Sequence, residues 1–134
     1  MKKSVFGLLV FVSICMGLQA KADEKEKGQL SAGRFKFGPY INSGIPSSIT
    51  KILNLEKKLV KRVSIQTAGS GGTFDTRIVK CDGEAVDLDS LSNFKLYANS
   101  KAEQKFDPKV CGAELVIDHT PNMYSEFTVY VDVQ

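Results

Sequence analysis

Residues 126–133 (EFTVYVDV) alternate apolar and polar side chains with a period of two. In an extended chain the apolar side chains share one face: Phe127, Val129, Val131 and Val133. Thr128, Tyr130 and Asp132 share the opposite face. One buried and one solvated face is typical of a strand in an antiparallel sheet. The segment therefore predicts a strand that covers a hydrophobic core.

Further segments with strand-like patterns lie between Gly-, Pro-, Asn- and Asp-containing stretches. They cover residues 34–40, 62–68, 73–81, 84–88, 93–99 and 113–119. Residues 69–72 (GSGG) predict a hairpin turn, and the polar residues 100–112 predict a loop. This arrangement predicts a mainly β fold, an antiparallel β-sandwich of about six or seven strands.

One segment favours a helix. A partial stripe with a period of 3.6 residues runs through Ile49, Ile52, Leu53, Leu55, Leu59 and Val60. Ser47 or Ser48 can cap the start of such a helix. We therefore expect one short helix within residues 47–57, which passes into a strand by about Lys61.

Residues 1–22 resemble a bacterial secretory signal peptide in their order of charges and apolar residues. Lys2 and Lys3 precede an uncharged apolar run over residues 5–18, and the small residues Ala20 and Ala22 follow. The pattern predicts cleavage between Ala22 and Asp23. The apolar run is shorter than the roughly 20 residues that span a bilayer, so we expect no transmembrane segment after cleavage.

The predicted organisation is a cleaved signal over 1–22, a flexible leader over 23–33 and a single β-rich domain over 34–134. Cleavage removes three lysines, and the formal charge of the whole chain, +3, falls to zero. Residues 23–62 carry nine bases and four acids, whereas residues 63–134 carry six bases and eleven acids. No segment combines a basic stripe with aromatic residues, so we expect no nucleic-acid partner.

Export also bears on the cysteines. Of the three cysteines in the chain, only Cys81 and Cys111 follow the signal. In an oxidising compartment, a pair of this kind predicts a disulfide bond. Two free thiols or a metal pair are the alternatives, but neither a C-x-x-C spacing nor histidines accompany the two cysteines. A periplasmic or secreted location follows from the signal and the disulfide together.

Few residues suggest catalysis or metal binding. Four carboxylates lie close in sequence: Asp82, Glu84, Asp87 and Asp89. They form either a solvated acidic edge, which the alternation favours, or a calcium site. His119 is the only histidine, and its place at a predicted strand end suggests the surface. We predict no catalytic residue, no metal and no cofactor.

These features predict a small exported binding protein that acts on another protein or an envelope component without catalysis. The basic cluster of Lys57, Lys58, Lys61 and Arg62 is a candidate for contact with an anionic surface, such as membrane lipid or lipopolysaccharide. The apolar face of residues 126–133 suggests an alternative, a fimbrial-like or surface subunit that donates its last strand to a partner. A carboxylate-dependent hydrolase is the least favoured alternative. The sequence does not define the oligomeric state.

Overall fold

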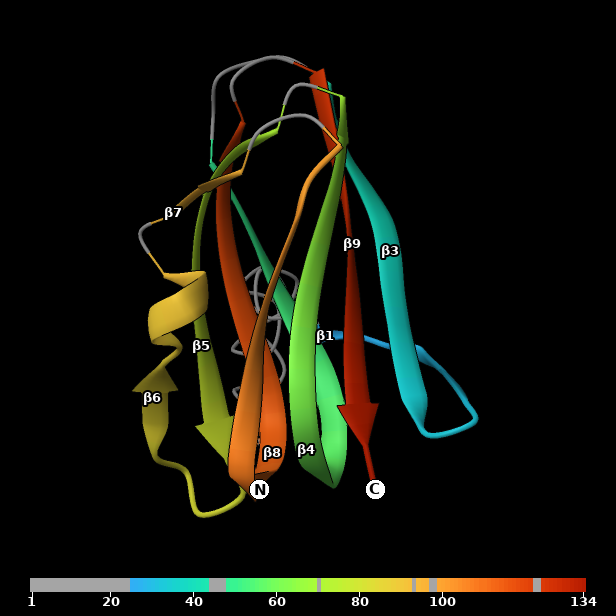
Figure 1. Ribbon diagram of the computed structural model, residues 1–134, viewed down its shortest axis with the longest axis vertical. Helices are drawn as coiled ribbons and strands as arrows, with labels where there is room; N and C mark the ends of the chain where they lie inside the picture. Colours follow the sequence, from blue (N-terminus) through green and yellow to red (C-terminus); the bar gives the residue numbers. More distant parts are fainter. Residues whose placement is uncertain (1–24, 44–47, 70, 93, 97–98, 122–123) are drawn as a thin grey trace, which may run out of the picture.

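The computed structural model describes residues 25–43, 48–69, 71–92, 94–96, 99–121 and 124–134 (Figure 1). Over these residues the chain forms nine strands and one 3₁₀ turn, η1. In chain order they are β1 (Lys25–Glu26), β2 (Gln29–Ser31), β3 (Arg34–Ser43), β4 (Ile49–Gly69), β5 (Gly72–Lys80), β6 (Ala85–Asp87), η1 (Asp89–Leu91), β7 (Phe94–Leu96), β8 (Lys101–Pro121) and β9 (Tyr124–Val133). The strands pair antiparallel except β1, which pairs parallel with β4.

Two long strands, β4 and β8, each fold back and take part in two sheets (Figure 1). In the first sheet, the first half of β4 pairs with the second half of β8, and β5 pairs with β8 on its other side. In the second sheet, the second half of β4 pairs with the first half of β8 and with β9, which in turn pairs with β3. The two sheets face each other as an antiparallel β-sandwich, which confirms the predicted fold class.

The core lies between the sheets and is formed by alternate residues of the strands. The second sheet contributes Phe35, Phe37, Val63, Ile65, Phe127, Val129, Val131 and Val133, and the first contributes Leu53, Leu55, Phe74, Ile78, Leu115 and Ile117. Complete burial of a large apolar side chain stabilises a fold by roughly 1.5–3 kcal/mol. The strand alternation read from residues 126–133 is thus the alternation of β9 in the structure.

The predicted helix within residues 47–57 is wrong, because the described part of this segment belongs to β4 from Ile49 onward. Leu53 and Leu55 are both fully buried, as alternate residues of one strand are. Leu53 pairs with Leu115 of β8, a partner that lies far away in sequence. The predicted loop over residues 100–112 is likewise wrong, because β8 begins at Lys101.

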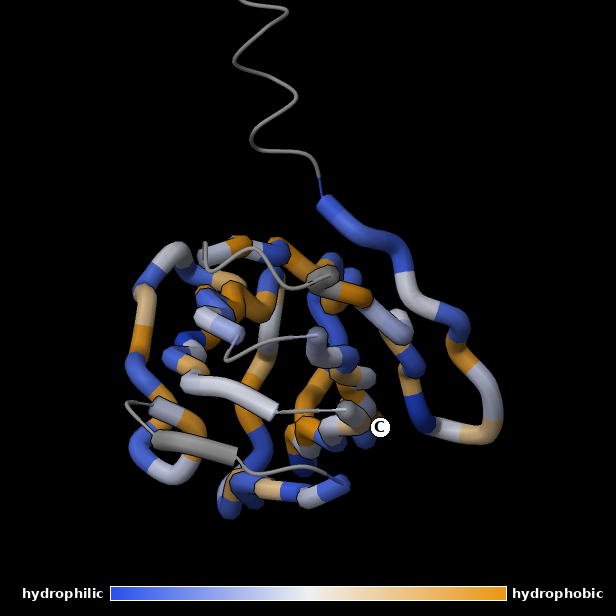
Figure 2. The backbone as a smooth tube through the Cα atoms, turned by 90° about the horizontal axis from the view of Figure 1, so that it is seen from above, coloured by the Kyte–Doolittle hydropathy of each residue, from blue (hydrophilic) through white to orange (hydrophobic). Residues whose placement is uncertain are grey.

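Within residues 25–33, which we expected to form part of a flexible leader, β1 pairs in the first sheet and β2 in the second. Lys25 is opposite Ile52 in the first sheet, and Gln29 is opposite Lys36 in the second. Figure 2 shows this segment along one side of the sandwich. A Cβ atom at Gly28 would lie 2.7 Å from the ring of Phe37, so glycine permits this close passage. The predicted cleavage point, Ala22 and Asp23, lies outside the described residues.

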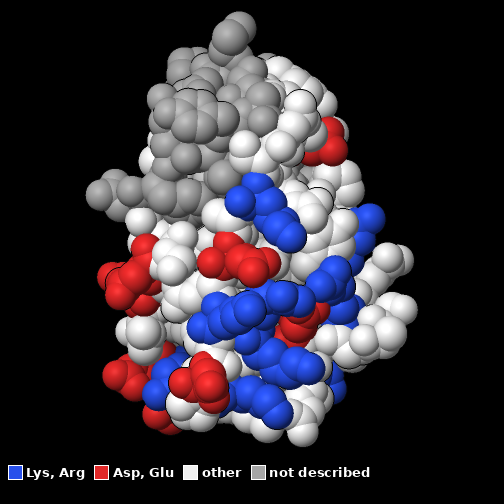
Figure 3. Space-filling view, in the orientation of Figure 1, with Lys and Arg blue, Asp and Glu red and all other residues white. Residues whose placement is uncertain are grey.

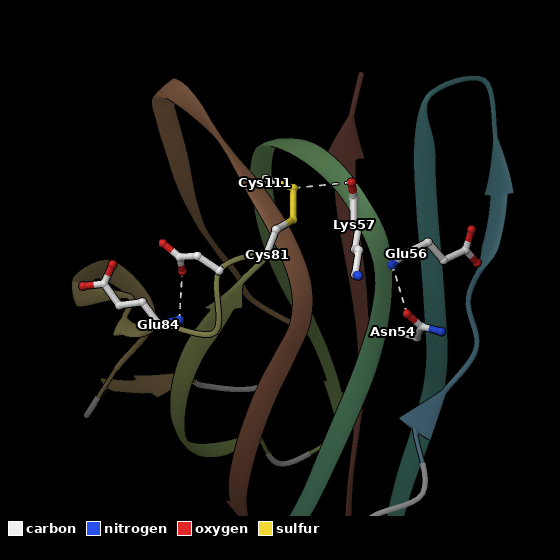
Figure 4. The surroundings of a disulfide bond; sticks show 7 residues. Asn54, Glu56, Lys57, Cys81, Glu84 and Cys111 are labelled. Carbon is white, nitrogen blue, oxygen red and sulfur yellow. Dashed lines mark hydrogen bonds between the residues drawn. A yellow bond between two sulfur atoms is a disulfide. The ribbon is translucent and has the colours of Figure 1, made fainter.

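A disulfide bond joins Cys81, which follows β5, to Cys111 of β8, as predicted (Figure 4). The two Cα atoms are 5.5 Å apart, and the Cys81 N–H donates to the Cys111 carbonyl at 3.0 Å. The bond therefore links neighbouring strands where β5 ends. Among the residues described, none forms a helix of the length and apolarity required to cross a bilayer.

Candidate functional site

A row of charged residues crosses the outer face of the second sheet. The register places Arg62 opposite both Lys105 of β8 and Asp132 of β9, and Asp132 opposite Arg34 of β3. These side chains point outward because their neighbours in sequence, such as Val63 and Val131, point into the core. Four strands therefore bring together three cations and one carboxylate that are widely separated in sequence.

Asp132 forms ion pairs with both Arg34 and Arg62. Its carboxylate accepts hydrogen bonds from Arg34 Nε at 2.6 Å and from Arg62 Nε at 2.8 Å, and a second nitrogen of Arg62 lies 2.7 Å away. Hydrogen bonds from Arg34, and then from Arg62, lower the pKa of Asp132 against the opposing effect of its burial. The pair with Asp132 also raises the pKa of Arg34. Both shifts favour the charged forms of Arg34 and Asp132.

The bases of this cluster are more accessible than the acid. The Asp132 side chain is 15% exposed, whereas those of Arg34 and Arg62 are 46% and 34% exposed. A guanidinium has five N–H groups, and Asp132 faces only the Nε edge of each arginine. Each arginine therefore keeps N–H groups that are not directed at Asp132, and its position is already fixed.

A concavity of about 600 Å³ surrounds this row; we call it the basic groove. Its lining consists of Ser31, Ala32, Gly33, Arg34, Lys61, Arg62, Lys105, Asp132 and Val133. In Figure 3, which shows this face of the molecule, Lys and Arg gather around a smaller acidic patch. Within the described part of the chain, Lys61 and Lys105 make no ion pair. The groove therefore carries an excess of positive charge.

A second concavity, of about 510 Å³, lies next to the basic groove and shares Lys61 with it. Its other lining residues are Phe106, Asp107, Pro108 and Lys109. Phe106 and Pro108 give this hollow an apolar and partly aromatic wall. The two hollows thus adjoin at Lys61, one lined mainly by cations and the other partly by apolar side chains.

The side chains of the basic groove are better suited to holding an anion than to proton transfer. Arginine stays protonated in proteins, so neither guanidinium can act as a base. The lowered pKa of Asp132 likewise makes that carboxylate a poor proton acceptor. Among the described residues, no three His, Cys, Asp or Glu side chains are grouped so that they could hold a metal ion.

The predicted cluster of four basic residues divides into two pairs. Lys61 and Arg62 line the basic groove. Lys57 and Lys58 lie at the fold of β4, where the Lys57 carbonyl oxygen is 3.5 Å from Cys111 Sγ (Figure 4). A disulfide sulfur has no hydrogen to donate, so this is a contact only. Lys61 and Arg62 therefore belong to the groove, whereas Lys57 and Lys58 lie near the disulfide.

The hypothesis that the last strand is donated to a partner requires β9 to lie at the edge of a sheet. This hypothesis is wrong, because β9 lies inside its sheet. β9 pairs with β3 on one side and with β4 on the other. The four side chains predicted as a partner-binding face are buried in the core: Phe127, Val129, Val131 and Val133. They are therefore inaccessible to a partner in the folded protein.

The prediction that His119 lies at the surface is also wrong, because its side chain is fully buried. β8 continues past it to Pro121, so His119 is not at the end of its strand. Its ring stacks on Phe74 at 4.5 Å, and Ser125 Oγ lies 3.3 Å from Nε2. Burial lowers the pKa of His119, and the Gly71 backbone acts in the opposite direction.

The carboxylates singled out in the sequence occupy separate local structures. Asp82 accepts the N–H of Glu84 at 2.9 Å, and Glu84 pairs with Lys80 at 3.1 Å. Asp87 belongs to β6 and Asp89 to η1. Four concavities over the described residues each have at most one carboxylate in the lining. The convergent pair that a carboxylate-dependent hydrolase requires is not present in them.

Sequence reasoning missed Arg34, Lys105 and Asp132. The alternation of residues 126–133 places Asp132 on the solvated face, and this was the one local signal available. The pairing of Asp132 with two arginines depends on the register of β9 with β3 and β4. No spacing along the chain encodes that register.

No family model and no curated protein matches this chain. Among solved structures, it is similar to CpGH89CBM32-6 produced by Clostridium perfringens, with a TM-score of 0.52 at 10% identity over 71% of this chain and 75% of that one. The F5/8 type C domain of a Bacteroides fragilis protein gives a TM-score of 0.49 at 12% identity, over 72% of this chain and 74% of that one. A low-affinity xylan-binding module from Roseburia intestinalis gives 0.40 at 12% identity, over 80% and 83%. The first similarity indicates a shared β-sandwich fold.

Proposed function

We propose that this protein is an exported, non-catalytic binding protein that takes an anionic component of the cell envelope in its basic groove. The observation that supports the proposal is the row formed by Lys105, Arg62, Asp132 and Arg34 on four adjacent strands. A carboxylate that fixes two arginines in place lowers the entropic cost of binding an anion there. A site with fixed arginines and no available base suits binding better than catalysis.

Location supports an envelope ligand. We propose that residues 1–22 are a signal peptide, cleaved between Ala22 and Asp23. The Cys81–Cys111 disulfide fits an oxidising compartment, the periplasm or the exterior. Because CpGH89CBM32-6 is named as a carbohydrate-binding module, a glycan is the first carrier of the anionic group to test.

The proposal is tested by co-sedimentation of the exported form, residues 23–134, with lipopolysaccharide aggregates. The informative variant is Arg34→Gln/Arg62→Gln. A basic side chain near an anionic surface contributes about 1 kcal/mol, so losing two should weaken binding about 30-fold. The matched control, Arg77→Gln/Lys80→Gln, removes two positive charges from β5 in the other sheet.

We expect the control variant to bind within about twofold of the wild type at about 0.1 M salt, where distant charges are largely screened. Equal losses in the two variants would show attraction by overall charge and would contradict the proposed site. Tighter binding of a 20-base-pair DNA duplex that also depends on Arg34 and Arg62 would contradict the envelope assignment.

A further inference from the structure

The charges of the basic groove bear on the kind of anion it binds. We infer that it recognises a phosphate monoester carried on a sugar. This inference rests on the proposed function and names the chemical group that the site selects. The four cationic residues of the lining are Arg34, Lys61, Arg62 and Lys105, and Asp132 is its one carboxylate.

Charge balance favours a dianion. Asp132 neutralises one of the four positive charges, so the lining keeps an excess of three. A ligand carboxylate or sulfate ester adds one negative charge, whereas a phosphate monoester adds between 1.5 and 2 at neutral pH. The monoester also presents three strong acceptor oxygens, and the groove offers N–H groups from two arginines and two lysines.

The shape of the site favours a phosphate that projects from its carrier. The groove is bordered by the turn between β2 and β3 on one side and by Lys61 and Lys105 on the other. A phosphate in the plane of a bilayer surface would approach such a concavity less closely than a terminal phosphate on a sugar. The adjoining hollow, which includes Phe106 and Pro108, provides a wall against which a sugar ring can pack.

The inference makes a pH-dependent prediction. The second pKa of a phosphate monoester is about 6, so its dianionic fraction falls about fourfold between pH 7.5 and pH 5.5. Over this range the ion pair at the centre of the groove keeps its charge. The pKa of Arg34 is raised and the pKa of Asp132 is lowered, so both shifts favour the charged forms.

The test is isothermal titration calorimetry of the exported form with glucose 6-phosphate and glucose 6-sulfate, which share a sugar and a position of attachment. We expect the phosphate to bind at least fivefold more tightly at pH 7.5. Its affinity should fall about fourfold at pH 5.5, and that of the sulfate should not change. Circular dichroism at pH 5.5 checks that the protein remains folded.

Two matched variants locate the binding. Arg62→Gln should weaken glucose 6-phosphate binding at least tenfold, and Arg77→Gln should leave it within twofold. Phe106→Leu, which keeps an apolar side chain but removes the aromatic face, should weaken glucose 6-phosphate binding and leave the affinity for inorganic phosphate unchanged. Equal effects of Phe106→Leu on the two ligands would overturn the role of the adjoining hollow.

Equal affinity for glucose 6-phosphate and glucose 6-sulfate, with no pH effect, would overturn the phosphate assignment. Binding of phosphatidic acid vesicles without binding of glucose 6-phosphate would identify a lipid carrier and overturn the sugar assignment. The proposed function survives either result if lipopolysaccharide binding still depends on Arg34 and Arg62. The proposed function is contradicted, whatever the chemistry of the anion, if lipopolysaccharide binding does not depend on Arg34 and Arg62.

Discussion

Removal of the Cys81–Cys111 disulfide should destabilise the protein by an amount that follows from its position. The bridge joins residues separated by 30 positions, and the chain-entropy relation then gives a stabilisation of about 3.6 kcal/mol. The Cys81 N–H also donates to the Cys111 carbonyl, so the two strands are already paired where the bridge forms. The bridge should therefore act mainly on the unfolded chain.

The assay is urea unfolding of the exported form, followed by far-ultraviolet circular dichroism. With a denaturant slope of about 2 kcal/mol per molar urea, the midpoint of Cys81→Ser/Cys111→Ser should fall by about 1.8 M. The wild type in excess reductant should give the same curve, and Cys81→Ala/Cys111→Ala controls for the polarity of serine. A midpoint shift below about 0.5 M in all three samples would refute the reasoning. Thiol titration of denatured, unreduced protein should detect no free thiol.

Three further predictions concern buried positions. The pKa of His119 in the folded state is below its ordinary value of 6.5, so the unfolded chain binds more protons as the pH drops below 6.5, and the stability of the wild type should fall. The measurement is urea unfolding at pH 7.5 and pH 5.5. If His119→Gln lost as much stability between these pH values as the wild type, the prediction would be contradicted. Gly72→Ala places a Cβ atom 2.6 Å from a carbonyl oxygen and should lower the free energy of unfolding by at least about 2 kcal/mol. In Gly83→Ala the new Cβ atom meets open space, but the positive φ should still lower the free energy of unfolding by about 1 kcal/mol. Thermal unfolding that gave the opposite order would contradict this prediction. Val129→Ala, at a buried position, should lower the free energy of unfolding by about 2 kcal/mol, and Thr128→Ala, at an outward-facing position, by about 0.5 kcal/mol. Chemical denaturation measures both values. Similar losses in the two variants would refute the assigned faces of β9.

The fold class could be predicted because its signals are local. Alternation in residues 126–133 identifies which side chains of β9 face the core, whatever strands lie beside it. The disulfide could be predicted because only Cys81 and Cys111 follow the proposed signal. Neither inference requires knowledge of strand register.

The errors arise where local patterns are ambiguous. Leu53 and Leu55 fit both a partial helical stripe and a strand alternation, and pairing with β8 decides in favour of the strand. Residues 100–112 are polar because the first half of β8 directs Lys101, Glu103 and Lys105 outward, opposite the outward residues of β4. A polar outer face of a strand and a polar loop have similar composition.

The candidate site could be predicted only in part. The sequence identified Lys61 and Arg62, which adjoin each other in the chain. It did not identify Asp132 and Arg34, because 98 positions separate them and strand pairing brings them to 2.6 Å. The basic part of the chain, residues 23–62, and the acidic part, residues 63–134, have opposite net charges of equal size. These charges are not paired one to one in the fold, because Asp132 pairs with two arginines.

The central claim is that the basic groove binds an anionic envelope component, and the arginine side chains report on it directly. The chain has three arginines, of which Arg34 and Arg62 line the groove and Arg77 lies in β5 of the other sheet. The measurement is a titration of the ¹⁵N-labelled exported form with the phosphorylated core oligosaccharide of deacylated lipopolysaccharide, followed through the three Nε–Hε signals. We predict saturable shifts of the Arg34 and Arg62 signals and a constant Arg77 signal. Shifts of equal size at all three arginines, or binding that moves neither groove arginine, would contradict the account.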